Sequence, residues 1–174
     1  MRPTRAIPPR MTLSLACRSF GPIVLAFAGG CAHVRVALSD RPCVETRHSC
    51  ISLNPDVTQE SATQTICVPG YAKSVRPASA YTQGVKAKLL REAGLDKSRM
   101  PDFELDHIVP LALGGHPRKL ANLRLQPWEG EHGAKRKDAL ENRLHNLVCR
   151  RELTLGEAQS CIAEDWEACA AKYL

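Results

Sequence analysis

Eight cysteines in a chain of 174 residues constrain the fold more than any other feature of the sequence. Two of them, Cys17 and Cys31, lie in the N-terminal segment, and no two are spaced as Cys-x-x-Cys, the spacing typical of a zinc site. In an exported protein the remaining even set predicts up to three disulfides, whose connectivity the spacing leaves open. The six are Cys43, Cys50, Cys67, Cys149, Cys161 and Cys169.

Local geometry restricts one of the pairings. Cys161 and Cys169 both lie in the segment after Thr154, which has the pattern of a helix. Residues at this separation on a helix lie roughly 12 Å apart along its axis, whereas the Cα atoms of a disulfide lie within about 7 Å of each other. These two cysteines can therefore pair only if the helix breaks between them.

The first 32 residues have the parts of a secretory signal peptide: arginines without acidic residues, the apolar run Phe20–Ala28, and small residues behind it. The apolar run is too short to span a membrane as a mature helix. The small residues before Cys31 also fit a lipoprotein cleavage site, so a lipid anchor at Cys31 and free release both stay open. We expect an exported protein, periplasmic, envelope-associated or secreted, with an irregular lead-in over 33–66 and a folded domain over 67–174.

The formal net charge of +6 is a weak argument for a nucleic-acid partner. Residues 1–30 hold four arginines, so the remainder has 20 basic and 18 acidic residues, a net charge of +2. Hydrophobic residues make up 44% of the chain, which suffices for a packed core and excludes wholesale disorder. No apolar run reaches about 18 residues, so we expect no permanent transmembrane helix.

Hydrophobic periodicity predicts a mixture of helices and strands, an α+β fold class. Gly94 has the place of a helix C-cap, Pro110 ends an alternating strand, and Thr154 with Glu157 forms a capping box. The predicted elements are helices that begin at Ser79, at about Ala134 and after Thr154, and strands over 103–109 and 123–125.

The stretch from Leu105 to Leu111 (LDHIVPL), with Gly114-Gly115 and Asn122-Leu123 behind it, resembles the core motif of the His-Asn-His (HNH) endonuclease family. Val75-Arg76-Pro77, Lys137-Asp138 and other short matches extend the resemblance to exported bacterial proteins built around this core, over about residues 57–170. The resemblance implies a ββα-metal (His-Me finger) core that is flanked by helices and stapled by disulfides.

The same resemblance implies metal-dependent hydrolysis of phosphodiester bonds in nucleic acid, with DNA favoured over RNA. His107 would be the general base, because a neutral imidazole has a pKa near the operating pH. Asp106 would hold a divalent ion that stabilises charge on the phosphate, and Asn122 would brace the loop between the strands and orient His107. Mg²⁺ is the expected ion for a carboxylate site, and Zn²⁺ or Mn²⁺ are alternatives if a histidine coordinates it.

The second metal ligand is expected at the start of the helix near Ala134. His132 lies near that position and is the predicted ligand; an alternative alignment puts Gly133 there and leaves Asp106 as the only firm ligand. Three basic residues of the same helix start are expected to neutralise phosphate, with a solvated helix face as the alternative; they are Lys135, Arg136 and Lys137. Trp128 is expected to be a partly buried anchor rather than a platform for a base.

Cys67 and Cys149 belong to the stretches that carry the wider resemblance, and we expect a structural disulfide there rather than reactive thiols. The expected function is an HNH endonuclease with His107 as its base. One alternative is a catalytically inactive nucleic-acid- or envelope-binding protein on the same scaffold, and another is a disulfide-rich structural lipoprotein. In a nuclease, the side chains of Asp106, His107 and His132 converge on one open cleft; divergence favours the alternatives.

Overall fold

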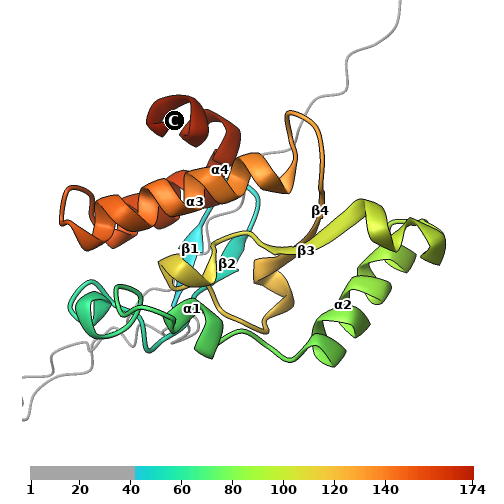
Figure 1. The fold of residues 1–174 in the computed structure, drawn as a ribbon, viewed down its shortest axis with the longest axis horizontal. Coiled ribbons are helices and arrows are strands. Elements are labelled where there is room, and N and C mark those ends of the chain that lie inside the picture. Colours follow the sequence, from blue (N-terminus) through green and yellow to red (C-terminus); the bar gives the residue numbers. More distant parts are fainter. Residues whose placement is uncertain (1–41) are drawn as a thin grey trace, which may run out of the picture. The chain divides into compact units, whose positions relative to one another are not determined.

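The computed structural model describes residues 42–174; the predicted signal peptide over 1–32, with Cys31, lies outside the described residues. Two small antiparallel sheets and four α-helices form an α+β fold in this part of the chain (Figure 1). The strands are β1 (Cys43–Glu45), β2 (Cys50–Ser52), β3 (Phe103–His107) and β4 (Leu123–Pro127), and the α-helices are α1 (Tyr71–Ser74), α2 (Ser79–Glu92), α3 (Ala134–Cys149) and α4 (Leu155–Tyr173). Short 3₁₀ turns lie at Ala62–Gln64, Lys97–Asp102, Leu111–Leu113 and Leu120–Asn122.

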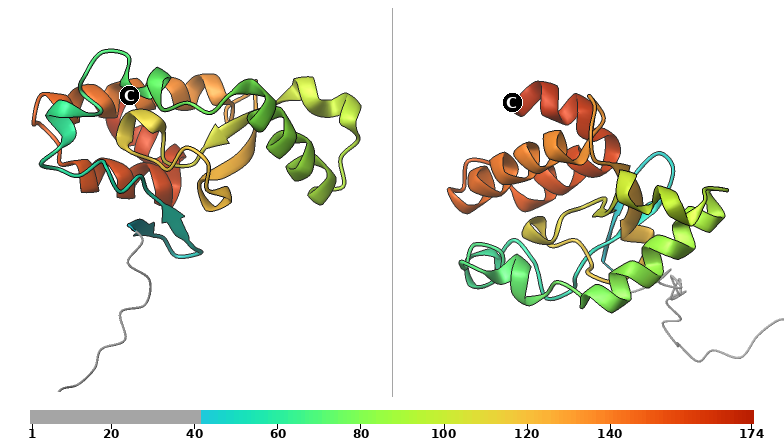
Figure 2. Two further views of the ribbon diagram at one scale, coloured as in Figure 1. Left: turned by 90° about the horizontal axis from the view of Figure 1, so that it is seen from below. Right: turned by 45° about the vertical axis from the view of Figure 1, so that its right-hand side comes forward.

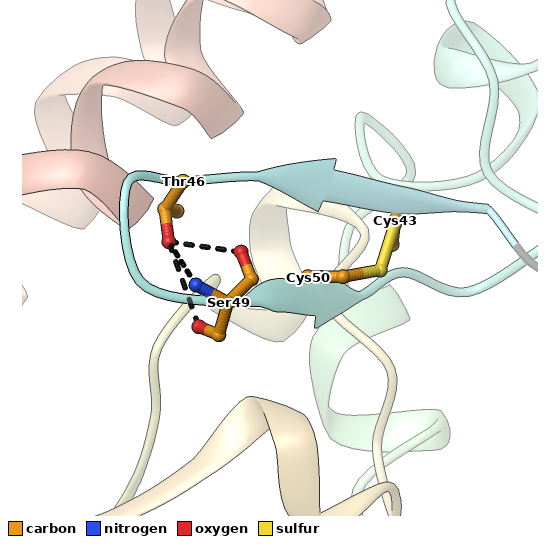
Figure 3. Close-up of a disulfide and its surroundings, with 4 residues drawn as sticks. All are labelled: Cys43, Thr46, Ser49 and Cys50. Carbon is orange, nitrogen blue, oxygen red and sulfur yellow. Dashed lines mark hydrogen bonds between the residues drawn. A yellow bond between two sulfur atoms is a disulfide. The ribbon is translucent and has the colours of Figure 1, made fainter. Parts of the chain in front are cut away.

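β1 and β2 form a hairpin that differs from the irregular lead-in expected over 33–66. Cys43 and Cys50 form a disulfide across it, and the Thr46 hydroxyl closes the turn (Figure 3). This hydroxyl accepts a hydrogen bond from the Ser49 N–H (3.1 Å) and donates one to the Ser49 carbonyl (2.9 Å). Strands of three residues held by a disulfide and a polar turn carry no apolar repeat, so periodicity does not detect them.

The segment after the hairpin also belongs to the folded part of the chain. Three of its apolar residues, Val57, Ala62 and Ile66, are buried in the main core together with Ile51 of β2. The domain therefore begins before residue 67, where the sequence places its start. The predicted start of the domain at residue 67 is too late. The buried residues before it are single apolar residues between turns, and they form no hydrophobic repeat that periodicity could detect.

β3 and β4 pair in an antiparallel register that sets Asp106 opposite Arg124 and His107 opposite Leu123. β3 ends at His107, two residues before the end of the predicted alternation, and Pro110 leads the chain into a 3₁₀ turn. Figures 1 and 2 show these two strands between α2 and the α3–α4 pair. The end of β3 thus lies within reach of side chains from the first turns of α3.

α3 and α4 lie side by side and bury their apolar faces in the core (Figure 1). The predicted capping box of Thr154 and Glu157 opens α4. Asp165 interrupts the helix with non-helical backbone angles (φ −159°, ψ 91°). Cys161 and Cys169, on either side of this break, form a disulfide with Cα atoms 5.5 Å apart. The break that this pairing requires is therefore present.

Cys67 and Cys149 form the third disulfide, which joins the segment before α1 to the last residue of α3. Three disulfides are typical of proteins from oxidising compartments, and they are consistent with export. Among the helices of residues 42–174, none combines the length and the apolar character needed to cross a membrane.

Candidate functional site

The end of β3 brings Asp106 and His107 into the wall of one small polar pocket. Neighbouring strand residues normally point to opposite faces, but β3 ends at His107, and both residues line this pocket. Its volume is about 40 Å³, which is enough for a water molecule. The other charged residues of its wall are Arg76, Glu104, Asp138 and Glu141.

His107 is held by one ring nitrogen. Its Nε2 lies 3.1 Å from the carbonyl oxygen of Pro117. A carbonyl oxygen only accepts hydrogen bonds, so Nε2 carries the hydrogen, and in the neutral ring Nδ1 carries the lone pair. Nδ1 has no hydrogen-bond partner among residues 42–174. Burial lowers the pKa of His107, more than the Pro117 carbonyl and the Asp106 carboxylate raise it, which favours the neutral form.

Asn122 joins the two ends of the loop that connects β3 to β4. It is entirely buried, and its side-chain oxygen accepts a hydrogen bond from the Val109 N–H at 2.8 Å. Its amide group donates to the carbonyls of Val109 (3.0 Å) and His116 (3.1 Å). Asn122 makes no hydrogen bond to His107; the His107 ring is oriented by Pro117 of the same loop. Asn122 is thus a positioning residue that acts through the loop backbone.

Glycine is required at one position of this loop. A Cβ atom on Gly115 would lie 1.8 Å from the Val109 carbonyl oxygen and 2.6 Å from the Asn122 amide nitrogen. The backbone at Gly115 therefore passes so close to the backbone at Val109 that no side chain fits between them. The loop is also tied to other elements, because Gln159 of α4 donates to the Leu113 carbonyl at 2.8 Å.

Lys137 from the first turn of α3 lies against Asp106. Its side chain is 1% exposed. The ammonium group lies 3.1 Å from the Asp106 carboxylate, donates to the His107 carbonyl at 2.9 Å, and pairs with Glu141. The phosphate contact expected of Lys137 does not hold in this arrangement, because all three donors of the ammonium group face protein acceptors. Burial raises the pKa of Glu141 to about 7, although Lys137 lowers it.

Arg124 is the second cation at Asp106. Its Nε lies 3.3 Å from the Asp106 carboxylate across the β3–β4 pair. Its Nη2 is the one buried side-chain nitrogen or oxygen atom without a hydrogen-bond partner in the described part of the chain. Two cations thus neutralise Asp106 from opposite elements, α3 and β4.

His132 lies apart from this pocket. Its Nδ1 faces the Glu167 carboxylate of α4, and its side chain is 68% exposed. Lys135 and Arg136 pair with two exposed acidic residues of the preceding loop, Glu129 and Glu131. Of the three residues expected from the sequence to converge in a nuclease, Asp106 and His107 line the pocket and His132 does not.

The side chains as arranged do not fit a divalent metal ion at Asp106. Both oxygens of that carboxylate face Lys137 or Arg124, and His132, the expected second ligand, contacts Glu167 instead. Within residues 42–174 the only group of three or more candidate ligand atoms close together is Cys67, His145 and Cys149. Its two sulfur atoms are bonded to each other and offer no thiolate. The expected Mg²⁺, Zn²⁺ or Mn²⁺ therefore has no complete donor set here.

The sequence assigns no role to Arg76, although Val75-Arg76-Pro77 is part of the resemblance. Arg76 is an exposed residue of the pocket wall, and it forms no ion pair with any described residue. A lone arginine outside the core motif gives no signal of its own. Only the wider match over residues 57–170 could have indicated it.

Comparisons with protein-family models, with curated proteins and with solved structures found no match for this chain.

Proposed function

We propose that this protein hydrolyses phosphodiester bonds in nucleic acid, with His107 as the general base, on a core of the HNH type. The order β3, loop, β4, α3 supports this, because it is the order of elements in the core that the sequence resembles. The observation that carries the proposal is the Nε2 contact of His107 with Pro117, which leaves the Nδ1 lone pair free in a residue that lines a space for water.

The residues of the pocket divide the reaction between them. His107 Nδ1 takes a proton from a water molecule whose oxygen attacks phosphorus, and the bond from phosphorus to the leaving oxygen breaks. That oxygen takes its proton from solvent. The Nε2–H contact with Pro117 keeps the ring in place while Nδ1 holds the proton. Arg76 offsets the negative charge of the phosphate, which otherwise repels the nucleophile.

A matched pair of histidine variants tests the proposal. His107→Ala should lose cleavage of plasmid DNA or of single-stranded oligonucleotides by a factor on the order of 10²–10⁴. His48→Ala should cleave like the parent, because His48 lies exposed in the β1–β2 turn. Circular dichroism and melting curves would show whether both variants fold. Equal cleavage by the parent and His107→Ala would rule out His107 as the base.

The position of His132 favours a second candidate, a catalytically inactive protein that binds nucleic acid on the same scaffold. In that case the parent and His107→Ala would both fail to cleave with added Mg²⁺, Mn²⁺ or Zn²⁺, while they bound the same oligonucleotides with equal affinity. The two candidates thus give opposite results in one assay.

A further inference from the structure

A larger groove adjoins the pocket of His107. Its volume is about 390 Å³, and it shares Arg76, Glu104 and Leu105 with the wall of the pocket. The groove continues along α2, with Trp128, at the end of β4, in its wall as well. A groove of this volume is within the range of small-molecule and cofactor sites.

Cationic, amide and aromatic side chains meet in this groove, beside the Glu104 carboxylate. Lys86 and Arg76 are cations that form no ion pair with any described residue. Gln83 is exposed on α2, and its amide has no hydrogen-bond partner in residues 42–174, so it offers both donors and an acceptor. Trp128 is 37% exposed, one of the four large hydrophobic residues of the described chain that are exposed. Trp128 is thus available to a ligand, beyond the anchoring role expected from the sequence.

This combination matches a nucleotide better than it matches other ligands. Cations bind phosphate, an exposed indole stacks on a base, and an amide can bond the edge of that base. Arg76 lies in both walls, so a phosphate at Arg76 is next to His107 on one side and to the groove on the other. The groove is therefore placed to receive the nucleotide that flanks this phosphate.

An indole can stack only on a base whose face is free. In a duplex both faces of each base are covered by its neighbours, whereas bases in single strands, loops and ends can be splayed out. We infer that the groove of Arg76, Gln83, Lys86 and Trp128 binds one unpaired nucleotide beside the phosphodiester at His107, so that the protein prefers single-stranded nucleic acid. This inference rests on the proposed function.

Binding measured without cleavage separates the inference from the proposed function. The protein is the His107→Ala variant, and the probes are short fluorescein-labelled thymidine and uridine homopolymers, alone and annealed to their complements. Single strands should bind at least about ten-fold more tightly than duplexes. The thymidine and uridine arms distinguish DNA from RNA as the source of the nucleotide.

Substitutions in the groove then locate the site. Trp128→Ala should weaken single-strand binding by about five- to 150-fold, as expected for the loss of one stacked base, and Trp128→Phe should retain part of it. Lys86→Ala should weaken binding less. Lys88→Ala is the matched control, because Lys88 lies on the same helix, pairs with Glu92 and does not line the groove. Oligonucleotides should also quench the fluorescence of Trp128 but not that of Trp166, which is 6% exposed.

Each outcome decides one point. Binding through Trp128 by a protein that never cleaves would refute the proposed function and keep the groove. Two results would overturn the inference and leave the proposed function standing. One is a Trp128→Ala variant whose cleavage and binding equal those of the parent, and the other is duplex binding as tight as single-strand binding.

Discussion

The loop over 108–122 and the segment over 128–137 are both predicted to contribute to the site, yet they are built in opposite ways. In the loop, Asn122 is entirely buried and makes three hydrogen bonds to backbone groups, and Gly115 touches the backbone of Val109. In the segment, the side chains of His132 and Lys135 are 68% and 69% exposed and pair with exposed carboxylates. Buried hydrogen bonds thus hold the loop in place, whereas the segment is held by exposed ion pairs that water or other carboxylates could replace.

This difference shows for which kind of residue a short sequence motif can predict the position in the structure. A buried backbone N–H or carbonyl must be paired, so the residue that pairs it has few alternatives of type or position. An exposed histidine has no such constraint, and nearby carboxylates or water serve it equally well. Lys137 is the exception within the segment, because its ammonium group is buried against Asp106.

The largest effect should come from the disulfide that encloses both regions. Cys67→Ala/Cys149→Ala should lose about 4–5 kcal/mol of unfolding free energy in the chain-entropy model, since the cysteines are 82 residues apart. Hydrogen exchange should accelerate in the loop and in the segment alike. Cys43→Ala/Cys50→Ala, with a separation of 7 residues, is the control, and its loss should be about half as large. An equal loss in the two variants would contradict the chain-entropy account.

Removing Asn122 should affect the loop alone. Asn122→Ala leaves three backbone groups unpaired in the interior, and we expect a loss of about 3 kcal/mol. Urea denaturation measures this loss, and hydrogen exchange should accelerate over 108–122 but not over 128–137. Asn142→Ala, at an exposed position of α3, should stay within about 0.5 kcal/mol of the parent. If exchange accelerated equally in both regions, the loop would not be an independently fixed unit.

Alanine substitutions at two glycines should change the stability of the protein in opposite directions. Gly115→Ala should destabilise the protein by about 1–3 kcal/mol, because its Cβ would overlap the Val109 carbonyl and force the loop to move. Gly84→Ala adds a Cβ within α2 with no atom closer than 4 Å, and it should stabilise the helix by up to about 1 kcal/mol. Thermal melting compares the two. A harmless Gly115→Ala would mean that the loop is loose.

The sequence predicts the α+β class, three of the four α-helices, both strands of the β3–β4 pair, and the places of Asp106 and His107. Periodicity indicates α2, α3 and α4 because each buries apolar residues along one face, and caps mark the end of α2 (Gly94) and the start of α4 (Thr154 with Glu157). No local sequence pattern predicts the break at Asp165. The non-helical backbone there lies inside a segment with the pattern of a helix, and it accompanies the disulfide of Cys161 and Cys169. The pairing of Lys137 with Asp106 and of His132 with Glu167 depends on how α3 and α4 approach β3, which sequence spacing does not contain.

The smallest effect on stability and cleavage should come from substituting His132, an exposed residue of the segment over 128–137. His132→Ala removes an exposed contact with Glu167, so unfolding free energy should change by less than about 1 kcal/mol, and cleavage should stay within about two-fold of the parent. Glu167→Ala completes a double-mutant cycle whose coupling should be similarly small. A large loss of cleavage in His132→Ala without a loss of stability would mean that the segment moves when substrate binds and carries His132 to Asp106. Lys137 or Arg124 would then have to leave that carboxylate, and the expected metal site would form only in the complex. Cleavage that does not change would instead place the chemistry with the loop and β3, the region that the buried contacts fix.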